Sequence, residues 1–133
     1  MPEILLDTHI LIWWRLDCGR LSRNQVHLLM DMEKRGRPVA ISAITLWEMA
    51  ILAARHRIEI KGPLNVWLEE IENHPLIAVI PVTARIAAES VSLGPEFHND
   101  PADQIIVATA RLHGLRLMTA DARIRRWGKI PIL

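Results

Sequence analysis

Short apolar runs alternate along this chain with longer segments in which apolar residues recur at helical spacing. Four runs cover residues 4–6, 38–42, 76–80 and 115–119, and we expect residues 130–133 to form a fifth strand at a sheet edge. Apolar runs of this length are typical of strands that are buried on both faces. The pattern predicts an α/β fold, a three-layer α/β/α sandwich with a mainly parallel sheet of four to five strands.

Capping signals divide the remaining segments into helices. Ser22 and Gln25 form a capping-box pattern, and Thr45 and Glu48 form a second one. Asp100 is a good N-cap residue, and Pro101 suits the first helical position that follows it. The expected helices cover residues 9–16, 22–36, 45–55, 63–73, 83–93 and 100–113, with a short one after residue 121. Residues 57–62 read as a small strand or a turn, and no linker or repeat divides residues 1–133, which we expect to form a single domain.

Composition narrows the class of protein. Half of the 133 residues are hydrophobic and 23% are charged, which excludes a disordered chain. A formal net charge of +1 gives no overall field, so any basic patch must be local. Cys18 is the only cysteine, so no disulfide can form within the chain. Without a signal peptide pattern or an apolar run near the roughly 20 residues that span a bilayer, we expect a cytoplasmic protein with no membrane partner.

Acidic residues gather at one predicted edge of the sheet. Asp7 ends the first strand, Glu48 lies just past the second, and Asp121 follows the fourth. Asp100 and Asp103 open the helix that leads into the fourth strand, and such a helix begins at the carboxyl edge. Because ligands bind beyond the carboxyl ends of parallel strands, we expect these carboxylates to face one cleft.

Helix capping is the alternative explanation for each acid taken alone. Capping does not require acids in preference to Ser, Thr or Asn, and it does not require them at one edge. Clustered carboxylates repel one another unless a cation neutralises them, and a donor set of oxygens alone favours Mg²⁺ or Mn²⁺. Such a site activates water and stabilises a phosphodiester during in-line displacement. No glycine-rich phosphate loop is present, which argues against nucleotide hydrolysis of the P-loop kind.

Four fragments carry a family resemblance in order and at suitable spacing. They are Leu5-Leu6-Asp7-Thr8-His9, Ser42 followed by Trp47-Glu48, His98-Asn99-Asp100-Pro101-Ala102-Asp103, and Thr119-Ala120-Asp121. The set resembles the PIN-domain ribonucleases, and most closely the VapC-type toxins of type II toxin–antitoxin pairs. The resemblance implies a Mg²⁺- or Mn²⁺-dependent endoribonuclease with an RNA substrate and a small antitoxin protein as partner.

The resemblance also assigns site residues. It places the catalytic, metal-holding acids at Asp7, Glu48, Asp103 and Asp121, with Asp100 as an extra acid of the branch whose motif runs Asp-Pro-x-Asp. It places Thr119 and Ser42 as supporting hydroxyl residues. That branch commonly has Arg where this chain has Gln104, a departure that affects a local ion pair or phosphate contact rather than the metal site.

Basic and aromatic residues suggest where partners bind. Arg123, Arg125, Arg126 and Lys129 cluster beside Asp121, where they are either RNA backbone contacts or a solvated helix face. Trp13 and Trp14 are about 100° apart on a helix, so we expect one of them to line an apolar groove. In the toxins that this chain resembles, an antitoxin segment occupies such a groove. His9 and His98 adjoin the acids and are candidates for proton transfer.

The residue pattern also allows two other functions. One is a non-catalytic RNA- or protein-binding domain on the same fold. The other is an aspartate-based phosphatase or phosphoacceptor domain in which Asp7 is the nucleophile. The phosphatase usually has a second acid two residues later, where this chain has His9, and a receiver domain needs an acceptor Asp after the third strand, where there is none. We also expect a homodimer.

Overall fold

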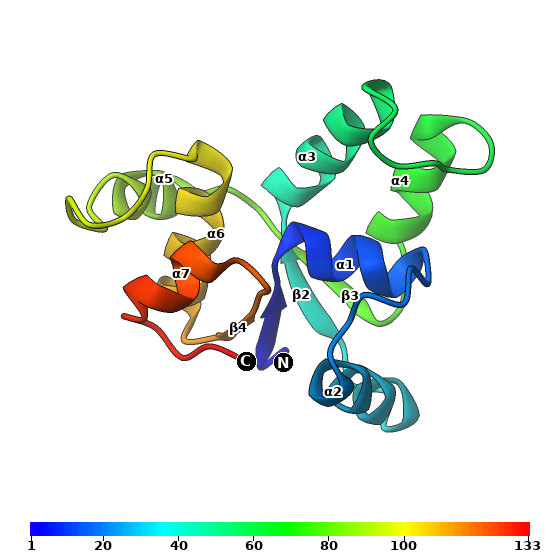
Figure 1. Ribbon diagram of the computed structural model, residues 1–133, viewed down its shortest axis with the longest axis horizontal. Helices are drawn as coiled ribbons and strands as arrows, with labels where there is room; N and C mark the ends of the chain where they lie inside the picture. Colours follow the sequence, from blue (N-terminus) through cyan, green and yellow to red (C-terminus); the bar gives the residue numbers. More distant parts are fainter.

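The computed structural model describes all residues, 1–133, and contains one sheet of four parallel strands in the order β3-β2-β1-β4 (Figure 1). The strands are β1 (Ile4–Leu6), β2 (Val39–Ser42), β3 (Ile77–Ile80) and β4 (Arg116–Met118). The predicted fifth strand is reduced to an isolated parallel bridge between Ile132 and Leu117. Pro131 lies in this segment and has no N–H to donate, which limits further pairing. The sheet therefore has four strands.

Seven helices connect and cover the strands. They are α1 (Thr8–Arg15), α2 (Arg23–Lys34), α3 (Ala43–Ala54), α4 (Leu64–Glu72), α5 (Ala84–Ser90), α6 (Pro101–His113) and α7 (Ala122–Trp127). Residues 57–62, which read as a strand or a turn, contain no strand. None of the seven helices combines the length and apolar character needed to cross a bilayer.

The sheet separates two hydrophobic cores. Ile4 and Leu6 point to one face of β1 and pack with residues of α1, α2, α3 and α4. Leu5 points to the opposite face and packs with residues of α6 and α7 and with Phe97. This alternation follows from the two-residue period of a strand. The result is the predicted three-layer α/β/α sandwich, with α5 packed on α6 at its outer side (Figure 1).

The helix starts confirm two capping predictions and correct a third. Ser22 and Gln25 form the reciprocal capping box of α2, and Asp100 caps α6 by accepting a hydrogen bond from the Asp103 N–H at 3.1 Å. The capping box predicted from Thr45 is wrong. Because β2 runs directly into α3, Ser42 is the N-cap of α3 and Thr45 is buried inside the helix. Glu48 therefore has no capping role.

Candidate active site

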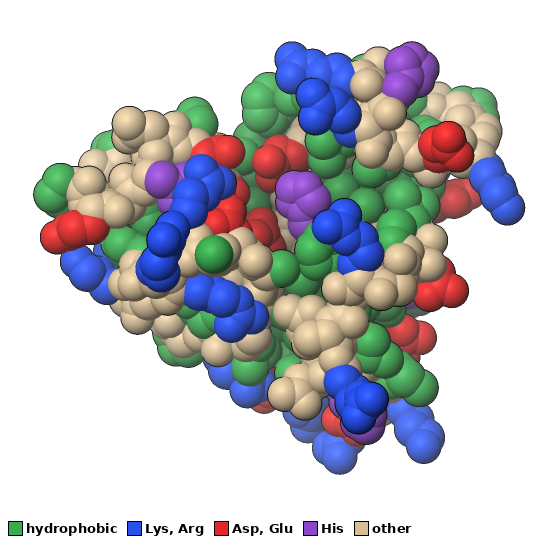
Figure 2. Space-filling model, viewed as in Figure 1, with side chains coloured by type: hydrophobic (Ala, Val, Ile, Leu, Met, Phe, Trp, Pro, Cys, Tyr) green, Lys and Arg blue, Asp and Glu red, His purple; other side chains and the backbone are tan.

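A pocket of about 200 Å³ opens at the carboxyl edge of the sheet. It is lined by all five acids that the sequence places at this edge: Asp7, Glu48, Asp100, Asp103 and Asp121. Figure 2 shows acidic side chains gathered in a hollow between the part of the molecule that holds α5–α7 and the part that holds α1 and α3. Carboxylates far apart in the sequence therefore meet in one cavity.

Asp7 is the most enclosed of these acids and is fixed from two sides. It follows β1 directly and caps α1, with Oδ1 accepting from the Thr8 N–H at 2.8 Å. Oδ2 accepts from the Thr119 hydroxyl at 2.7 Å, just beyond β4. Burial raises the pKa of Asp7, although these hydrogen bonds and the nearby His9 oppose the rise. The two bonds hold the carboxylate in one orientation.

Glu48 reaches the pocket from the second turn of α3. Its Oε1 accepts a short hydrogen bond from the Thr8 hydroxyl, and that hydroxyl also contacts the Thr45 hydroxyl at 3.0 Å. Burial raises the pKa of Glu48 to about 7, and the neighbouring carboxylates of Asp103 and Asp7 add to the rise. Sequence reasoning assigned no role to Thr8, although a hydroxyl directly after Asp7 was visible in the motif.

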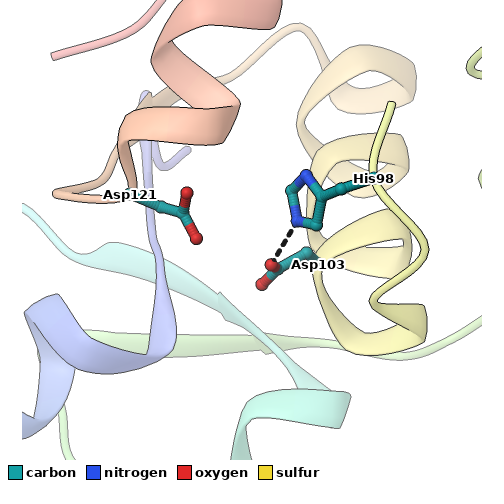
Figure 3. A group of neighbouring side chains, drawn as sticks. All are labelled: His98, Asp103 and Asp121. Atoms are coloured by element: carbon teal, nitrogen blue, oxygen red, sulfur yellow. Dashed lines mark hydrogen bonds and ion pairs between the residues drawn. The ribbon is translucent and has the colours of Figure 1, made fainter. Parts of the chain in front are cut away.

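Asp103 projects from the first turn of α6 toward Asp121 (Figure 3). Its Oδ2 lies 2.7 Å from Nε2 of His98, which comes from the loop before the helix. The His98 ring stacks on Phe97 with ring centroids 4.5 Å apart, and Phe97 meets Trp127 edge-on. Burial raises the pKa of Asp103 to about 6, while the bond from His98 opposes the rise. His98 therefore orients an acid.

Asp121 differs from the other acids because one guanidinium donates hydrogen bonds to both of its oxygens. The Arg123 guanidinium donates from Nη2 to Oδ2 at 3.0 Å and from Nε to Oδ1 at 3.3 Å. Burial opposes ionisation, but the hydrogen bonds from Arg123 hold the pKa of Asp121 below its usual range. Asp121 also caps α7, where Oδ1 accepts from the N–H groups of Arg123 and Ile124. Both carboxylate oxygens of Asp121 thus have a hydrogen-bond partner within the protein.

The remaining polar residues of the motifs have structural contacts. Asp100 is the N-cap of α6, and the same residue also lines the pocket. Gln104 donates from its side chain to the His98 carbonyl at 3.2 Å, which fixes the loop that carries the histidine. Ser42 is buried and accepts from the Ile44 N–H as the cap of α3. It does not line the pocket.

The four basic residues near α7 separate into different environments. Arg123 lines the acidic pocket. Arg125 donates to the backbone carbonyls of Thr119 and Leu133, which ties the C-terminal segment to the end of β4. Lys129 lies 3.5 Å from the Glu96 carboxylate, and Arg126 is exposed without a salt bridge. They do not form one continuous patch around the acids.

Trp13 and Trp14 both line a groove of about 420 Å³ between α1 and α2, together with Leu21, Val26, Leu29 and Met30. The Trp14 indole donates to Glu33 on α2 at 2.8 Å. Trp13 also lines the acidic pocket, next to the exposed His9. The apolar groove and the acidic pocket therefore share one wall.

The donor set of the pocket fits a hard divalent cation. Carboxylate oxygens dominate it, and a ring nitrogen of His98 lies within 4.8 Å of carboxylate oxygens of both Asp103 and Asp121. A second imidazole, that of His9, lines the pocket. Burial, with repulsion from the neighbouring carboxylates, raises the pKa of Glu48 to about 7 and that of Asp103 to about 6, and a bound cation would offset both effects. Mg²⁺ and Mn²⁺ prefer oxygen ligands and retain several waters. At about 30 Å³ for each water, the pocket has room for roughly six waters or a hydrated ion.

Known proteins resemble this chain over nearly its whole length. A model of the PIN domain family matches residues 4–130. Ribonuclease VapC22 of Mycobacterium tuberculosis (strain ATCC 25618 / H37Rv) is 36% identical over 125 residues, which cover 94% of this chain and 92% of that protein.

Solved structures show the same fold. A chain in a toxin–antitoxin complex from Klebsiella pneumoniae is 29% identical, with a TM-score of 0.63 over 98% of this chain and 95% of that chain. The structure of VapBC2 from Rickettsia felis bound to a DNA fragment from its promoter contains a chain that is 18% identical to this one. The TM-score is 0.71, and the match covers 98% of this chain and 96% of that chain. The family match over nearly the whole chain and the identity to a ribonuclease of the same size show that this chain belongs to the PIN-domain family.

Proposed function

We propose that this protein is an endoribonuclease that depends on Mg²⁺ or Mn²⁺, and that it is the toxin of a type II toxin–antitoxin pair, with residues 1–133 acting as one domain. The observation that carries the proposal is the convergence of Asp7, Glu48 and Asp103 in one pocket, where burial and mutual repulsion raise the pKa of Glu48 and of Asp103. The similarity to Ribonuclease VapC22 and to chains of toxin–antitoxin complexes supports the substrate class and the kind of partner.

Each side chain of the pocket has a distinct part in this proposal. Asp7, Glu48 and Asp103 hold the divalent ion, directly or through water. Thr119 and Thr8 donate hydrogen bonds that orient the carboxylates of Asp7 and Glu48. A divalent ion bound there supplies activation of water and neutralisation of charge at the phosphodiester.

The hydrogen bonds of Asp7 also weigh against a phosphatase with an aspartate nucleophile. Both of its oxygens accept from fixed donors, the Thr8 N–H and the Thr119 hydroxyl. These bonds stabilise the negative charge and reduce the nucleophilicity of the carboxylate. They suit an acid that stays in place and holds a cation.

The groove between α1 and α2 is the proposed site for an antitoxin segment. It is apolar, it is formed largely by Trp13, Trp14 and α2, and it adjoins the acidic pocket through Trp13. A partner segment seated in the groove would therefore reach the mouth of the pocket. This arrangement explains how one partner can block the site without displacing any strand.

The function is tested with protein from which any bound partner has been removed. Single-stranded RNAs of varied sequence should be cut in Mg²⁺ or Mn²⁺ and left intact in EDTA. Asp7→Asn and Asp103→Asn should abolish cutting while the circular dichroism spectrum stays unchanged. Asp31→Asn is the matched control, because Asp31 is exposed on α2 and pairs only with Arg35.

The outcomes separate the candidate functions. Cleavage retained in both Asp7→Asn and Asp103→Asn refutes the assignment of the site. A wild type that binds RNA but cuts none of the sequences supports the non-catalytic binding domain. Hydrolysis of a phosphomonoester with covalent labelling of Asp7 supports the phosphatase.

A further inference from the structure

Aromatic rings line only one side of the acidic pocket. Its ten lining residues include two such side chains, His9 and Trp13, and both belong to α1. The side toward α7 is lined by Ala120, Asp121 and Arg123, which carry no ring. A pocket with room for roughly six waters is too small for a whole nucleotide. The bases attached to a phosphate bound in the pocket must therefore lie at its rim.

The two rings stand about one helical turn apart on the same face of α1. Residues four apart are neighbours on a helix surface, and the ring centroids of His9 and Trp13 are 6.0 Å apart at an angle of 57°. Asp7 comes directly before this helix, so the row of rings begins beside the acids. Arg20, in the loop between α1 and α2, lies with its guanidinium carbon 4.8 Å from the centre of the Trp13 ring. Three flat groups therefore follow one another along this rim.

The row is open to solvent. His9 is exposed and Trp13 is half-buried. The indole N–H of Trp13 has no partner in the protein and is not a buried unpaired atom, so it faces water. The indole N–H of Trp14, by contrast, donates to Glu33 at 2.8 Å. Figure 2 shows His, Lys or Arg, and hydrophobic side chains next to one another over α1, beside the acidic hollow. Ring surface and a hydrogen-bond donor are both available to a ligand.

The chemistry of this rim suits an unpaired nucleobase. Proteins hold the bases of single-stranded RNA by stacking them on aromatic rings, histidine included, and on the planes of arginine side chains. Every base has a π face, so such stacking does not require one particular base. The free indole N–H of Trp13 can also donate to a base carbonyl. A phosphate among the acids would bring a neighbouring base to these rings.

We propose that His9 and Trp13 form a binding subsite for one unpaired base of the RNA, that of a nucleotide next to the cleaved phosphodiester. The proposal rests on the proposed function and sharpens it, because it names the part of the substrate that the α1 rim binds. RNA fits this rim better than an antitoxin segment does, because His9 lines the acidic pocket and not the groove between α1 and α2. Trp13 lines both, so bound RNA and a bound antitoxin segment would compete for its ring.

Steady-state cleavage of a short single-stranded RNA separates stacking from a part in the chemistry. His9→Ala and Trp13→Ala should each raise KM about tenfold, within the usual range for one lost base–aromatic stack. They should leave kcat within about threefold of the wild type, because stacking stabilises bound substrate and transition state alike. His9→Phe and Trp13→Phe keep a ring and should recover most of the loss in KM. Trp13→Leu, which keeps apolar bulk without a ring, takes the place of Trp13→Ala if that variant does not fold.

The matched controls are His27→Ala and Trp47→Ala, which remove exposed rings that do not line the pocket. Both should keep the KM of the wild type. A fall in kcat in His9→Phe as large as that in His9→Ala assigns His9 to proton transfer and overturns the proposal. A rise in KM in the controls equal to that in His9→Ala and Trp13→Ala also overturns it.

An abasic RNA identifies the base itself. One abasic sugar is placed at each position of the oligonucleotide in turn, and affinity is measured by fluorescence anisotropy in the inactive Asp103→Asn background. At one position next to the cleaved linkage, loss of the base should weaken binding about tenfold. When His9→Ala/Trp13→Ala is added, the same abasic sugar should have no effect, because the rings that the base stacks on are gone. An abasic loss at that position that is unchanged in this variant overturns the proposal.

The partner protein supplies the remaining comparison. Variants of His9 and Trp13 that bind RNA as tightly as the wild type, but no longer retain a co-purified antitoxin, assign the rim to the protein partner and overturn the proposal. A wild type that cuts no RNA refutes the proposed function, while the abasic comparison still decides whether a base stacks on these rings.

Discussion

Replacement of Glu48 by Gln should stabilise the metal-free protein, and should do so only above mildly acidic pH. The side chain of Glu48 keeps its shape in Glu48→Gln, and the amide oxygen can still accept from the Thr8 hydroxyl. The charge is what changes. Burial among other acids raises the pKa of Glu48 from 4.5 to about 7, so ionisation of this group opposes folding.

The sign and size follow from that shift. Below pH 4.5 Glu48 is protonated in the folded and the unfolded chain, and its ionisation does not affect stability. Between pH 4.5 and about 7 the unfolded chain releases the proton first, so stability falls, and above that range the loss is complete. At about 1.36 kcal/mol for each pKa unit, the loss is about 0.8 kcal/mol at pH 5 and about 3.3 kcal/mol at pH 8. Allowing for the part of the carboxylate that water reaches, the change between the two pH values is about 2 kcal/mol.

Urea unfolding in EDTA at pH 5 and pH 8 measures this effect. The free energy of unfolding of Glu48→Gln minus that of the wild type should be about 2 kcal/mol larger (more positive) at pH 8 than at pH 5. Glu72→Gln, at an exposed position on α4, is the control and should keep the pH dependence of the wild type. A difference between Glu48→Gln and the wild type that is equal at both pH values, within about 0.5 kcal/mol, refutes the reasoning.

Three further predictions follow from the same pocket. Thr119→Val removes a buried hydroxyl that donates to Asp7 and should lower the free energy of unfolding, measured in urea, by about 1–3 kcal/mol. Thr119→Ser keeps the hydroxyl and should lower the free energy of unfolding by less than half of that amount. Thr8→Val leaves the Glu48 carboxylate without its donor and should lower the rate of RNA cleavage, while Thr8→Ser should keep most of it; equal losses in steady-state kinetics contradict the orienting role. Mg²⁺ at about 100 times its Kd at pH 8 should stabilise the protein by about 2.7 kcal/mol at that pH. The same Mg²⁺ concentration should raise Tm in a thermal melt less at pH 5 than at pH 8, because Glu48 and Asp103 must release protons to bind the ion at pH 5.

The layered fold and its family could be predicted from the sequence because both depend on local patterns. The apolar runs that become β1 to β4 are short, continuous and separated by helical spacing. The sequence overpredicts the fifth strand, because apolar character alone does not show that Pro131 interrupts the pairing. The sequence predicts too late a start for α3, because the capping-box pattern at Thr45 and Glu48 hides the direct passage from strand to helix at Ser42.

The site could be predicted in outline but not in its contacts. The carboxyl-edge argument brings the acids to one place, and they do line one pocket. It does not show which acid is paired with a cation, because the contact between Arg123 and Asp103 depends on how α7 packs beside α6. It also does not show that Thr8 holds Glu48, a contact across 40 residues of chain. These contacts depend on tertiary packing, which periodicity does not encode.

The pairing of the first and last strands has a consequence for how the protein is made. The Asp7 N–H donates to the Met118 carbonyl at 2.9 Å, and the Asp7 carboxylate is oriented by Thr119, which is 112 residues later in the chain. During synthesis the N-terminal part of a chain emerges first. The pocket is therefore incomplete until β4 and α7 have left the ribosome, and a growing or truncated chain lacks the oriented acids. A nuclease of this design would stay inert toward the RNA that encodes it until that segment has been synthesised.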